Sequence, residues 1–463
     1  MLFNVTYSKT RYLMKTGKFL SSIFVVTILL GLQSCTNKLI KSNQYRLNSA
    51  IIDQTEEIQN FINTHDTTYL PAGTYIITQI KISSNKTILT DGFVTKLKQL
   101  PSPVGTPVML VMGENIKIDS ISVEGSIETD QGEWSHGLAI MSKTKTTKNV
   151  EIKGLHAKNI RGDGLYIGTL DALSNCKNII ANNIEVENCL RNGVSVVTGE
   201  NIYINNVIVK GAGLFGIDIE GDPPKIPLRN ITVSDVVGPC IGIIGGGEVA
   251  SNITFKNVKA NGIFAGSKPA YQHKVNSGVV VRNASSVTFE NLDIQNFEKF
   301  AIDFVFERTD KINEKITIKN LTIKDVSLKE NIYNAYILTT GVKYFSIDTL
   351  NAEIGNGKSL FLGNDAKIES DEQTVDIKNA VTNGGYFARY TKILGDNLTL
   401  INCEYCFQKL HKGSTIKNSK LSGIVINSLS TDTHFFNTTV KFSKSKFENC
   451  QKQFETNVKE LKE

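Results

Sequence analysis

The sequence is poor in the features that mark multidomain, membrane-spanning and nucleic-acid-binding proteins. Its 463 residues include only nine prolines and one tryptophan, which argues against proline-rich linkers between lobes. The longest apolar run, Phe19 to Leu32, is too short for a stable membrane span. The formal net charge of +6 falls to +2 without residues 1–35, which carry four basic residues and no acids. A balance this close to zero gives no reason to expect a nucleic-acid partner.

Cysteines are also few, and their spacing does not favour a metal site or a catalytic thiol. Cys403 and Cys406 form a Cys-x-x-Cys pair, but a zinc site needs a second pair that the chain lacks. Cys176, Cys189 and Cys240 lie where a small buried apolar side chain would fit. We therefore expect structural or free cysteines.

What the sequence does have is a repeat in its middle. A phrase of the form Asn-Ile/Val-x-Ile/Val, then Asn-x-x-Val/Ile, then Gly-aliphatic-x-aliphatic, recurs at steps of 29, 23, 29 and 22 residues. A unit this short cannot bury its own apolar face, so it must stack on copies of itself. The alternation with β-branched residues indicates strands rather than helices. The repeat therefore predicts a parallel β-helix. Its leading residues are Asn149, Asn178, Asn201, Asn230 and Asn252.

Alternation within the repeat predicts which side chains fill the core. In each Gly-aliphatic-x-aliphatic strand the two aliphatic side chains should point inward. The leading asparagines should stack in an inside turn, where their amides hydrogen-bond from coil to coil as in other Asn ladders. The expected inward pairs are Leu138/Ile140, Leu165/Ile167, Val194/Val196, Ile217/Ile219 and Ile302/Phe304.

The N-terminus has the pattern of an export signal, and Met14 is an alternative start of translation. Lys15 and Lys18 precede the short apolar run, and Leu-Gln-Ser-Cys35 ends it. This ending resembles the lipobox of bacterial lipoproteins, in which the cysteine is acylated. We expect residues 1–35 to be a lipoprotein signal peptide. An exported protein would then be anchored in the bacterial cell envelope through lipid on Cys35, at the outer membrane or the periplasmic face.

The rest of the chain divides into a tether, a solenoid and a cap. Residues 36–50 are polar and should be a tether, and residues 51–440 should be the β-helix. Within the latter, residues 51–64 have the pattern of an amphipathic helix that covers an open end of the solenoid. Residues 441–463 lose the alternation and should be a C-terminal cap, ending in a short helix.

Three N-terminal segments carry a resemblance to a known superfamily. The segments TEEIQNFI (55–62), LPAGTY (70–75) and SNKTILTDG (84–92) resemble the start of pectate-lyase-like proteins, and the Asn-Ile-x-Ile coils resemble their right-handed β-helix repeats. The resemblance implies a single-stranded right-handed parallel β-helix of about 15 coils with an N-terminal capping helix. The superfamily includes pectin and alginate lyases, polygalacturonase-type hydrolases and phage tailspike depolymerases. The resemblance therefore implies that the partner of this protein is a polysaccharide.

Aligning the glycines of successive repeats places polar residues on one outward face. The position two after the glycine holds Ala139, Tyr166, Ser195, Asp218 and, in the fifth coil, Ile244. Such a face suits an extended polysaccharide, with aromatic rings such as Tyr166 or Phe215 available to stack on a sugar. The expected patch, bordered by Phe215, contains Glu133, His136, Asp163, Tyr166, Arg191, Asn192, Ser195, Asp218 and Glu220.

Within the patch, Asp218 and Glu220 are the expected acid and base. They are two residues apart on one strand, so their backbones lie ~6.6 Å apart on the same face. This spacing loosely fits the carboxylate separation of an inverting glycosidase. Asp163 should lie ~14 Å from Asp218, two coils away. We expect Asp163 to pair with His136 instead and to orient or bind the substrate.

The resemblance leaves the reaction open. Where polygalacturonase-type hydrolases have Asp-Asp, this chain has Gly-Asp163-Gly, and neither Gly-His-Gly nor Arg-Ile-Lys follows. Pectate lyases use a calcium cluster of acids with an arginine base. By that resemblance, calcium would lie at Asp163, Asp218 and Glu220, and Arg191 would be the base.

Three functions are therefore open. The preferred one is a glycoside hydrolase with no cofactor. The second is a lyase or C5-epimerase acting on uronic acids, with or without calcium and with Arg191, His136 or Tyr166 as base. The third is a non-catalytic β-helix for glycan binding or adhesion.

Overall fold

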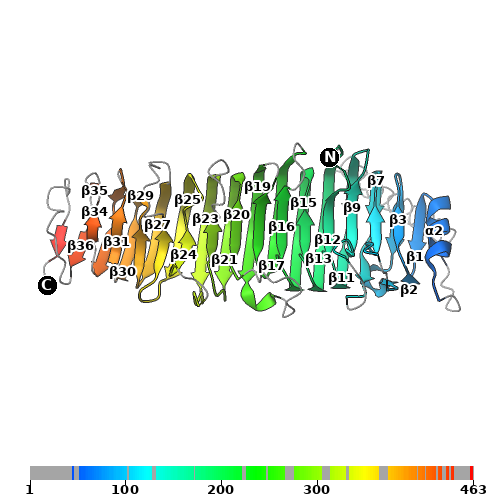
Figure 1. Ribbon diagram of the computed structural model, residues 1–463, viewed down its shortest axis with the longest axis horizontal. Coiled ribbons are helices and arrows are strands. Elements are labelled where there is room, and N and C mark those ends of the chain that lie inside the picture. The colour runs from blue at the N-terminus through cyan, green and yellow to red at the C-terminus, as the bar shows by residue number, and fades with distance from the viewer. Residues whose placement is uncertain are drawn as a thin grey trace, which may run out of the picture.

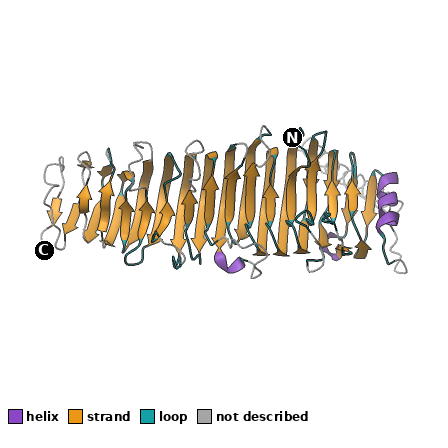
Figure 2. Ribbon diagram, in the orientation of Figure 1, coloured by secondary structure: helices purple, strands orange, loops and turns teal. Residues whose placement is uncertain are grey.

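The protein is a long rod of stacked coils (Figure 1). The computed structural model describes residues 44–45, 52–101, 104–127, 132–171, 173–221, 226–246, 249–265, 276–304, 313–329, 333–363, 374–403, 405–411, 413–423, 426–429, 434–436, 439–442 and 459–461. Nearly all of the described elements are strands (Figure 2). The parallel β-helix predicted from the repeat is confirmed.

One sheet runs along one side of the rod and contains one short strand from each coil. Its strands pair in parallel with the coils before and after; β12, for example, lies between β9 and β14. Within the described residues this sheet, called sheet B, has 14 strands, close to the expected number of coils. They are β3 (Ile80–Ile82), β6 (Met109–Val111), β9 (Leu138–Ser142), β12 (Leu165–Thr169), β14 (Val194–Val196), β16 (Ile217–Gly221), β18 (Ile241–Gly245), β20 (Val279–Arg282), β22 (Ile302–Phe304), β24 (Ala335–Leu338), β26 (Ser359–Leu362), β28 (Tyr386–Arg389), β31 (Tyr405–Leu410) and β34 (Ile426–Leu429).

The other strands form the 23-stranded sheet A, which closes each coil. Its N-terminal strands are β1 (Thr67–Leu70), β2 (Gly73–Ile77), β4 (Thr87–Thr90), β5 (Thr95–Gln99), β7 (Glu114–Ile118), β8 (Ile121–Glu124), β10 (Thr147–Ile152) and β11 (Leu155–Ile160). The long central strands are β13 (Cys176–Cys189), β15 (Gly199–Ala212), β17 (Leu228–Gly238), β19 (Ala250–Asn261), β21 (Ala284–Gln295), β23 (Glu314–Lys324), β25 (Tyr344–Glu353) and β27 (Thr374–Asn383). The C-terminal strands are β29 (Lys392–Asp396), β30 (Leu398–Cys403), β32 (Thr415–Lys417), β33 (Lys420–Gly423), β35 (His434–Phe436), β36 (Thr439–Phe442) and β37 (Lys459–Leu461).

The long strands of sheet A bend at asparagines with left-handed backbone conformations. In β13 these are Asn178, Asn183 and Asn188, with φ of 54°, 53° and 57°. Asparagine tolerates this region better than other non-glycine residues, which explains why it recurs at each corner. The predicted ladder is confirmed: the Asn178 amide donates to Asn149 Oδ1, and the Asn201 amide donates to Asn178 Oδ1, both at 3.1 Å.

The position of this ladder differs from the expected one. Its asparagines are exposed at an outer corner rather than packed in an inside turn. The left-handed bend directs each amide outward, because the neighbouring strand positions send aliphatic side chains inward. The alternation was interpreted correctly: every side chain of the five predicted inward pairs is at most 1% exposed. The buried cysteines Cys176, Cys189, Cys240, Cys403 and Cys406 are free thiols, as expected.

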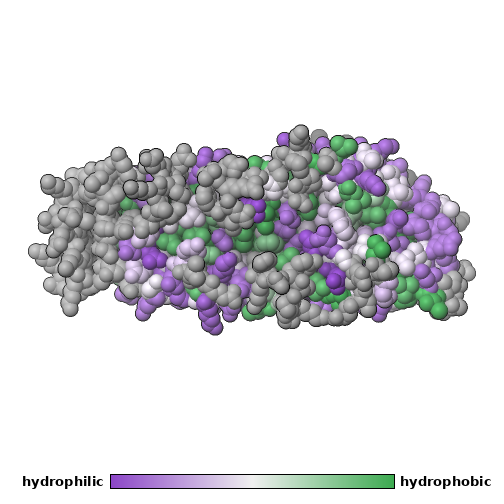
Figure 3. All heavy atoms as spheres, viewed as in Figure 1, coloured by the Kyte–Doolittle hydropathy of each residue, from purple (hydrophilic) through white to green (hydrophobic). Residues whose placement is uncertain are grey.

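Helix α2 (Thr55–Thr64) covers the N-terminal end of the solenoid (Figure 1). Asp53 accepts a hydrogen bond from the Thr55 backbone N–H, and Ile58 and Ile62 are buried against the first coil. The helix begins later than predicted, since Ile52 is exposed outside it. Its outer surface is mainly hydrophilic (Figure 3). Two short 3-10 turns, η1 (Gly92–Val94) and η2 (Gly262–Phe264), lie farther along.

The segments expected to flank the solenoid are only partly described. The expected signal peptide and Cys35 lie outside the described residues. In the expected tether, Tyr45 is buried between Phe61 and Tyr75, so this part of the tether packs on the solenoid instead of leaving it. In the expected C-terminal cap, Lys459–Leu461 pairs with β36 as a strand, so the expected helix is wrong for these residues. Among the described helices, none has the length and apolar character to cross a membrane.

Candidate functional site

Four successive strands of sheet B bring the predicted patch together. Tyr166 pairs with Ala139 and Ser195, and Ser195 pairs with Asp218, so these residues form one outward column. The column continues to Gly242, because Asp218 pairs with Gly242. The predicted alignment of the fifth coil is therefore wrong by two residues.

The cause of this error lies in the residue that precedes the strand. Ile244 pairs with Glu220, not Asp218, and Cys240 occupies the position that glycine holds in the four preceding coils. Aligning the coils on glycine alone therefore gave the wrong register for the fifth coil. The buried alternating pair Ile241 and Ile243 carries the correct register.

The patch is recessed rather than the open face expected from the sequence. His136, Asp163, Asn192 and Ser195 are each 1% exposed, and Asp218 is 3% exposed. A strand pattern gives the direction of a side chain but not what covers it. Burial matters here because polar groups outside water need partners inside the protein.

His136 and Asp163 lie together, as predicted. The Asp163 backbone N–H donates to His136 Nδ1 at 3.0 Å, and Asp163 Oδ2 lies 3.5 Å from the same nitrogen. The Tyr166 ring stacks on the imidazole at 4.4 Å between centroids. Trp134, which is 41% exposed, packs edge-on against both rings. The aromatic group therefore ends in an indole that reaches solvent.

Asn192 joins the two buried aspartates. Its backbone N–H donates to Asp163 Oδ1 at 2.9 Å, and its amide Nδ2 donates to Asp218 Oδ2 at 2.9 Å. The same amide lies 3.0 Å from Ser195 Oγ, and its oxygen accepts from the Phe215 backbone N–H. The separation of Asp163 from Asp218 expected from the sequence is therefore bridged by one residue.

Arg191 connects the network to the surface. Its guanidinium binds the exposed carboxylate of Glu133 and lies 3.6 Å from Asp163 Oδ1. One cation therefore serves two carboxylates, one exposed and one buried. All four residues predicted as catalytic and all six predicted as substrate-binding lie in or beside this cluster, although their roles stay predictions.

Burial controls the protonation of the cluster. Burial raises the pKa of Asp163 to about 6, even though Arg191 and the Asn192 N–H lower it. Burial, followed by the charges of Glu220 and Asp163, holds the pKa of Asp218 well above its usual range. Burial lowers the pKa of His136 to about 3, and Arg191 lowers it further. At neutral pH His136 is therefore uncharged, and Asp218 keeps its proton to a higher pH than an ordinary aspartate does.

The hydrogen bonds leave two polar groups of the cluster without a partner in the protein. His136 Nδ1 accepts from a backbone N–H, so the imidazole proton is on Nε2, which has no partner. Asp218 Oδ1 is also unpartnered and lies beside Gly242, where a Cβ would come within 3.0 Å of it and 2.9 Å of the Phe215 ring. The imidazole donor and one oxygen of the acid are thus buried without a partner in the protein, and the sequence analysis did not identify the need for glycine at 242.

The geometry does not support the calcium alternative. Arg191 and the Asn192 backbone N–H occupy the surroundings of Asp163, and the Asn192 amide binds one oxygen of Asp218, so both carboxyl groups already interact with donors of the protein rather than facing a shared cation site. Across the described ranges, no three His, Cys, Asp or Glu side chains gather in a way that could hold a metal.

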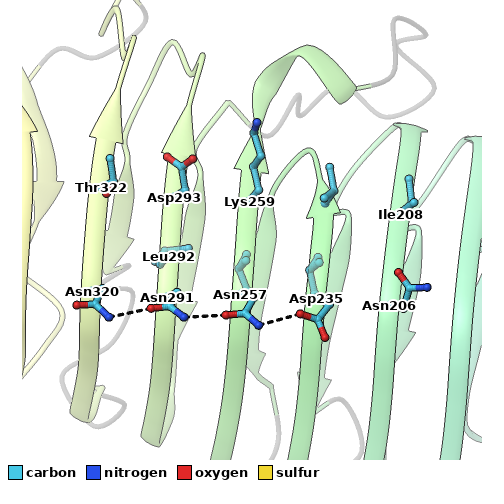
Figure 4. A pocket seen from close by; sticks show the side chains of 13 residues that line it. Asn206, Ile208, Asp235, Asn257, Lys259, Asn291, Leu292, Asp293, Asn320 and Thr322 are labelled. Atoms are coloured by element: carbon cyan, nitrogen blue, oxygen red, sulfur yellow. Dashed lines mark hydrogen bonds between the residues drawn. The ribbon is translucent and has the colours of Figure 1, made fainter.

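A groove of about 590 Å³ lies elsewhere, on the outer side of sheet A (Figure 4). It follows an Asn ladder in which Asn320, Asn291 and Asn257 donate in turn and Asp235 accepts at the end. Beside the ladder, Ile208, Lys259, Asp293 and Thr322 line the groove. This groove lacks the buried network of the sheet B cluster.

Comparison with known proteins gives one family match. The family model described as rhamnogalacturonase A/epimerase, pectate lyase-like, matches residues 48–266, a segment that contains the whole cluster. No curated protein sequence matches the chain significantly.

Several solved structures are similar in architecture. The A-module of the Azotobacter vinelandii mannuronan C-5 epimerase AlgE4 is 14% identical, with a TM-score of 0.47, covering 74% of this chain and 94% of the module. Tailspike protein gp49 of Acinetobacter baumannii bacteriophage Fri1, a capsular polysaccharide depolymerase, is 16% identical, with a TM-score of 0.45 and coverage of 73% and 60%. The catalytic domain of a GH87 α-1,3-glucanase in complex with nigerose is 14% identical, with a TM-score of 0.37 and coverage of 91% and 68%.

Proposed function

We propose that this protein acts on a polysaccharide and hydrolyses a glycosidic bond at the Asp218 cluster of sheet B. The observation that carries the proposal is a buried acid with a raised pKa and one oxygen that has no hydrogen-bond partner, next to a second carboxyl residue on the same strand. The match of residues 48–266 to a family described as rhamnogalacturonase A/epimerase supports a carbohydrate substrate.

In this mechanism Asp218 is the general acid. Asn192 holds Oδ2, which leaves Oδ1 to give its proton to the leaving glycosidic oxygen. The raised pKa of Asp218 favours the protonated form that a general acid needs. Glu220, two residues along β16, removes a proton from the attacking water. Their backbone spacing of ~6.6 Å on one face favours inversion of configuration.

The remaining residues of the cluster bind and orient the sugar. His136 donates its Nε2–H to a hydroxyl group of the substrate. Tyr166 and the Asp163 backbone N–H hold the imidazole ring of His136 in place. Arg191 and Glu133 form the polar edge, with Trp134 beside them as a surface for a sugar ring.

A lyase or epimerase acting on uronic acids is the second candidate. It is favoured by Arg191, whose guanidinium can neutralise a uronate carboxylate next to the cluster, and by the family description. His136 is the weakest of its proposed bases, because its pKa of about 3 and its protonated Nε2 leave it no proton-accepting role at neutral pH.

Products separate these functions. The protein is incubated with a panel of plant and algal polysaccharides, and new reducing ends and ultraviolet absorbance of unsaturated sugars are measured. Hydrolysis predicts new reducing ends without unsaturation, whereas elimination produces both. Reducing ends that carry a strong ultraviolet signal would replace the hydrolase with the lyase.

The variants Asp218→Asn and Glu220→Gln test the assignment of the acid and the base. Each should lower kcat by about 10²- to 10⁴-fold, because it removes general acid or base catalysis. Asp235→Asn, the same change in the sheet A ladder, is the control and should retain full activity. Full turnover in the Asp218 and Glu220 variants would refute the site, and glycan binding without turnover in the wild type would favour a binding protein.

We also propose that the mature protein is exported and held at a membrane through acylated Cys35. The expressed full chain should incorporate labelled fatty acid, and Cys35→Ala should release the protein from the membrane fraction. A Cys35→Ala protein that still fractionates with membranes would overturn the anchor.

A further inference from the structure

A second buried acid lies on the same face of sheet B, away from the candidate active site. Asp303 is the central, outward residue of β22 and is only 9% exposed. Among the described residues no group forms a hydrogen bond with its carboxyl group, and Lys299 is the cation that acts on it electrostatically. Its strand neighbours in the column are Val280 and Leu338, which are both apolar.

Such a residue costs stability unless something else uses it. A carboxyl group that is largely buried loses part of its hydration, and among the described residues only the charge of Lys299 compensates for that loss. Burial correspondingly raises the pKa of Asp303 to about 6. An apolar residue of similar size would fit between Val280 and Leu338 with less strain on the fold. The presence of a carboxyl group here therefore indicates a ligand that supplies hydrogen-bond donors.

The position of Asp303 relates it to the candidate active site. Asp218 pairs with Gly242, Gly242 with Val280, and Val280 with Asp303, all in one outward column. Three strand spacings of ~4.8 Å separate the two aspartates by ~14 Å along the rod. An oligosaccharide lying along the rod reaches both residues, whereas a single sugar does not.

An exposed aromatic ring lies on the next coil. Tyr333, two residues before β24, is 51% exposed and stacks at 6.3 Å on Phe300, which is buried two residues before β22. The buried Phe300 fixes the direction of the tyrosine ring. Exposed rings with an apolar face are suitable surfaces for the apolar side of a sugar.

We propose that Asp303 and Tyr333 form a distal subsite that binds an uncharged sugar residue of the polysaccharide. The Asp303 carboxyl group accepts hydrogen bonds from sugar hydroxyl groups, and the Tyr333 ring stacks against the sugar. A uronate residue is disfavoured, because its carboxylate would face the Asp303 carboxylate. This proposal rests on the proposed function for its ligand class but not for its reaction.

Binding of hexasaccharides to the full chain tests the subsite. Asp218→Asn serves as the reference protein so that no probe is consumed, and the probes are cellohexaose, a β-1,4-linked galactan hexamer and a galacturonate hexamer. Calorimetry should show that the reference binds at least one uncharged hexamer. Adding Asp303→Leu or Tyr333→Ala should lower that affinity at least tenfold, whereas Asp293→Leu, the same change on sheet A, should leave it unchanged.

Thermal unfolding distinguishes a binding role from a structural one. Asp303→Leu should fold with a higher Tm, because it replaces a largely buried acid that accepts no hydrogen bond from the described residues with an apolar side chain. A higher Tm with unchanged hexamer affinity would overturn the subsite, as would a reference protein that binds only the galacturonate hexamer or none of the three. The reaction is judged separately: hydrolysis by the wild type with unaltered binding in the Asp303 variant removes only the subsite. Tenfold weaker binding without hydrolysis by the wild type removes only the proposed reaction.

Discussion

The Asp218 cluster of sheet B and the Asn ladder of sheet A both contain asparagines and aspartates, but they differ in burial and in hydrogen-bond partners. Along the ladder, Asn257 and Asn320 are exposed and bond to the equivalent side chain one coil away. In the cluster, Asn192 and Asp218 are buried and bond to residues of other types. Side-chain polarity therefore does not distinguish the two regions, whereas burial and dissimilar hydrogen-bond partners do.

Periodicity explains the difference. A ladder position repeats because every coil needs the same bend, so its residue follows from the backbone. The sheet B column changes at each step, from Ala139 through Tyr166, Ser195 and Asp218 to Gly242. When the residue type changes from coil to coil at one position but stays the same at the neighbouring positions, folding does not dictate that residue. Functional residues are expected at such positions.

The largest effect should come from replacing the residue that joins the buried acids. Asn192→Ala removes the donor to Asp218 Oδ2 and the acceptor of the Phe215 N–H. Unpaired buried groups should lower the free energy of unfolding by about 1–3 kcal/mol. Displacement of Asp218, the proposed general acid, should lower kcat on the order of 10²-fold. Asn201→Ala, in the ladder, should lower stability without changing kcat, and equal kcat losses in both would erase the distinction between the regions.

The pH dependence of stability should distinguish a buried acid from an exposed one. The pKa of Asp163 is about 6 in the folded protein, above its ordinary value, so the folded state binds the proton more tightly. Stability should therefore fall as pH rises from about 4 to 6, by about 3 kcal/mol at 1.36 kcal/mol per pKa unit. Urea unfolding of the wild type and Asp163→Asn over this range measures the difference.

Asp171 is the matched control for this experiment. The backbone N–H groups of Thr144 and Leu173 lower the pKa of this partly exposed acid to about 2. Its contribution to stability should therefore be lost in the opposite direction, as pH falls from about 4 to 2. If Asp163→Asn and the wild type had parallel profiles between pH 4 and 6, the Asp163 side chain would not be the buried acid described.

The repeat determines how much of this could be predicted from the sequence. The coils, the inward pairs such as Leu165/Ile167, the amide ladder and the shared face of Tyr166, Ser195 and Asp218 all follow from period and alternation. These features are local, because each depends on a residue and its equivalent in the next coil.

The features that sequence analysis missed depend on contacts between non-equivalent residues. The burial of Asp163, its link to Asp218 through Asn192 and the glycine needed at 242 depend on side-chain reach, which alternation does not give. Likewise, alternation shows that Asp303 points outward but not that it lacks a partner.

In the ladder, two substitutions at one position should separate backbone from side-chain effects. Asn257, at φ 51°, donates to Asp235 and accepts from Asn291. Asn257→Ala loses both bonds and adds left-handed strain of about 1–2 kcal/mol. Asn257→Gly loses the bonds but keeps the bend without strain, so it should be the more stable variant in urea unfolding. Activity should be unchanged in both, and equal stability would mean that the bend carries no strain.

The smallest effect should come from completing the ladder at its break. Asp235 accepts from Asn257 but, as a carboxylate, cannot donate to Asn206 on the preceding coil, and no hydrogen bond joins the two (Figure 4). Asn206 itself donates onward to Asn183. Asp235→Asn supplies the missing donor and keeps a residue suited to φ 54°. It should raise the free energy of unfolding by about 0.5–1.5 kcal/mol in urea titrations, because one exposed hydrogen bond is added. A loss of stability would mean that the carboxylate at 235 has a role of its own, and the ladder would then not be purely structural.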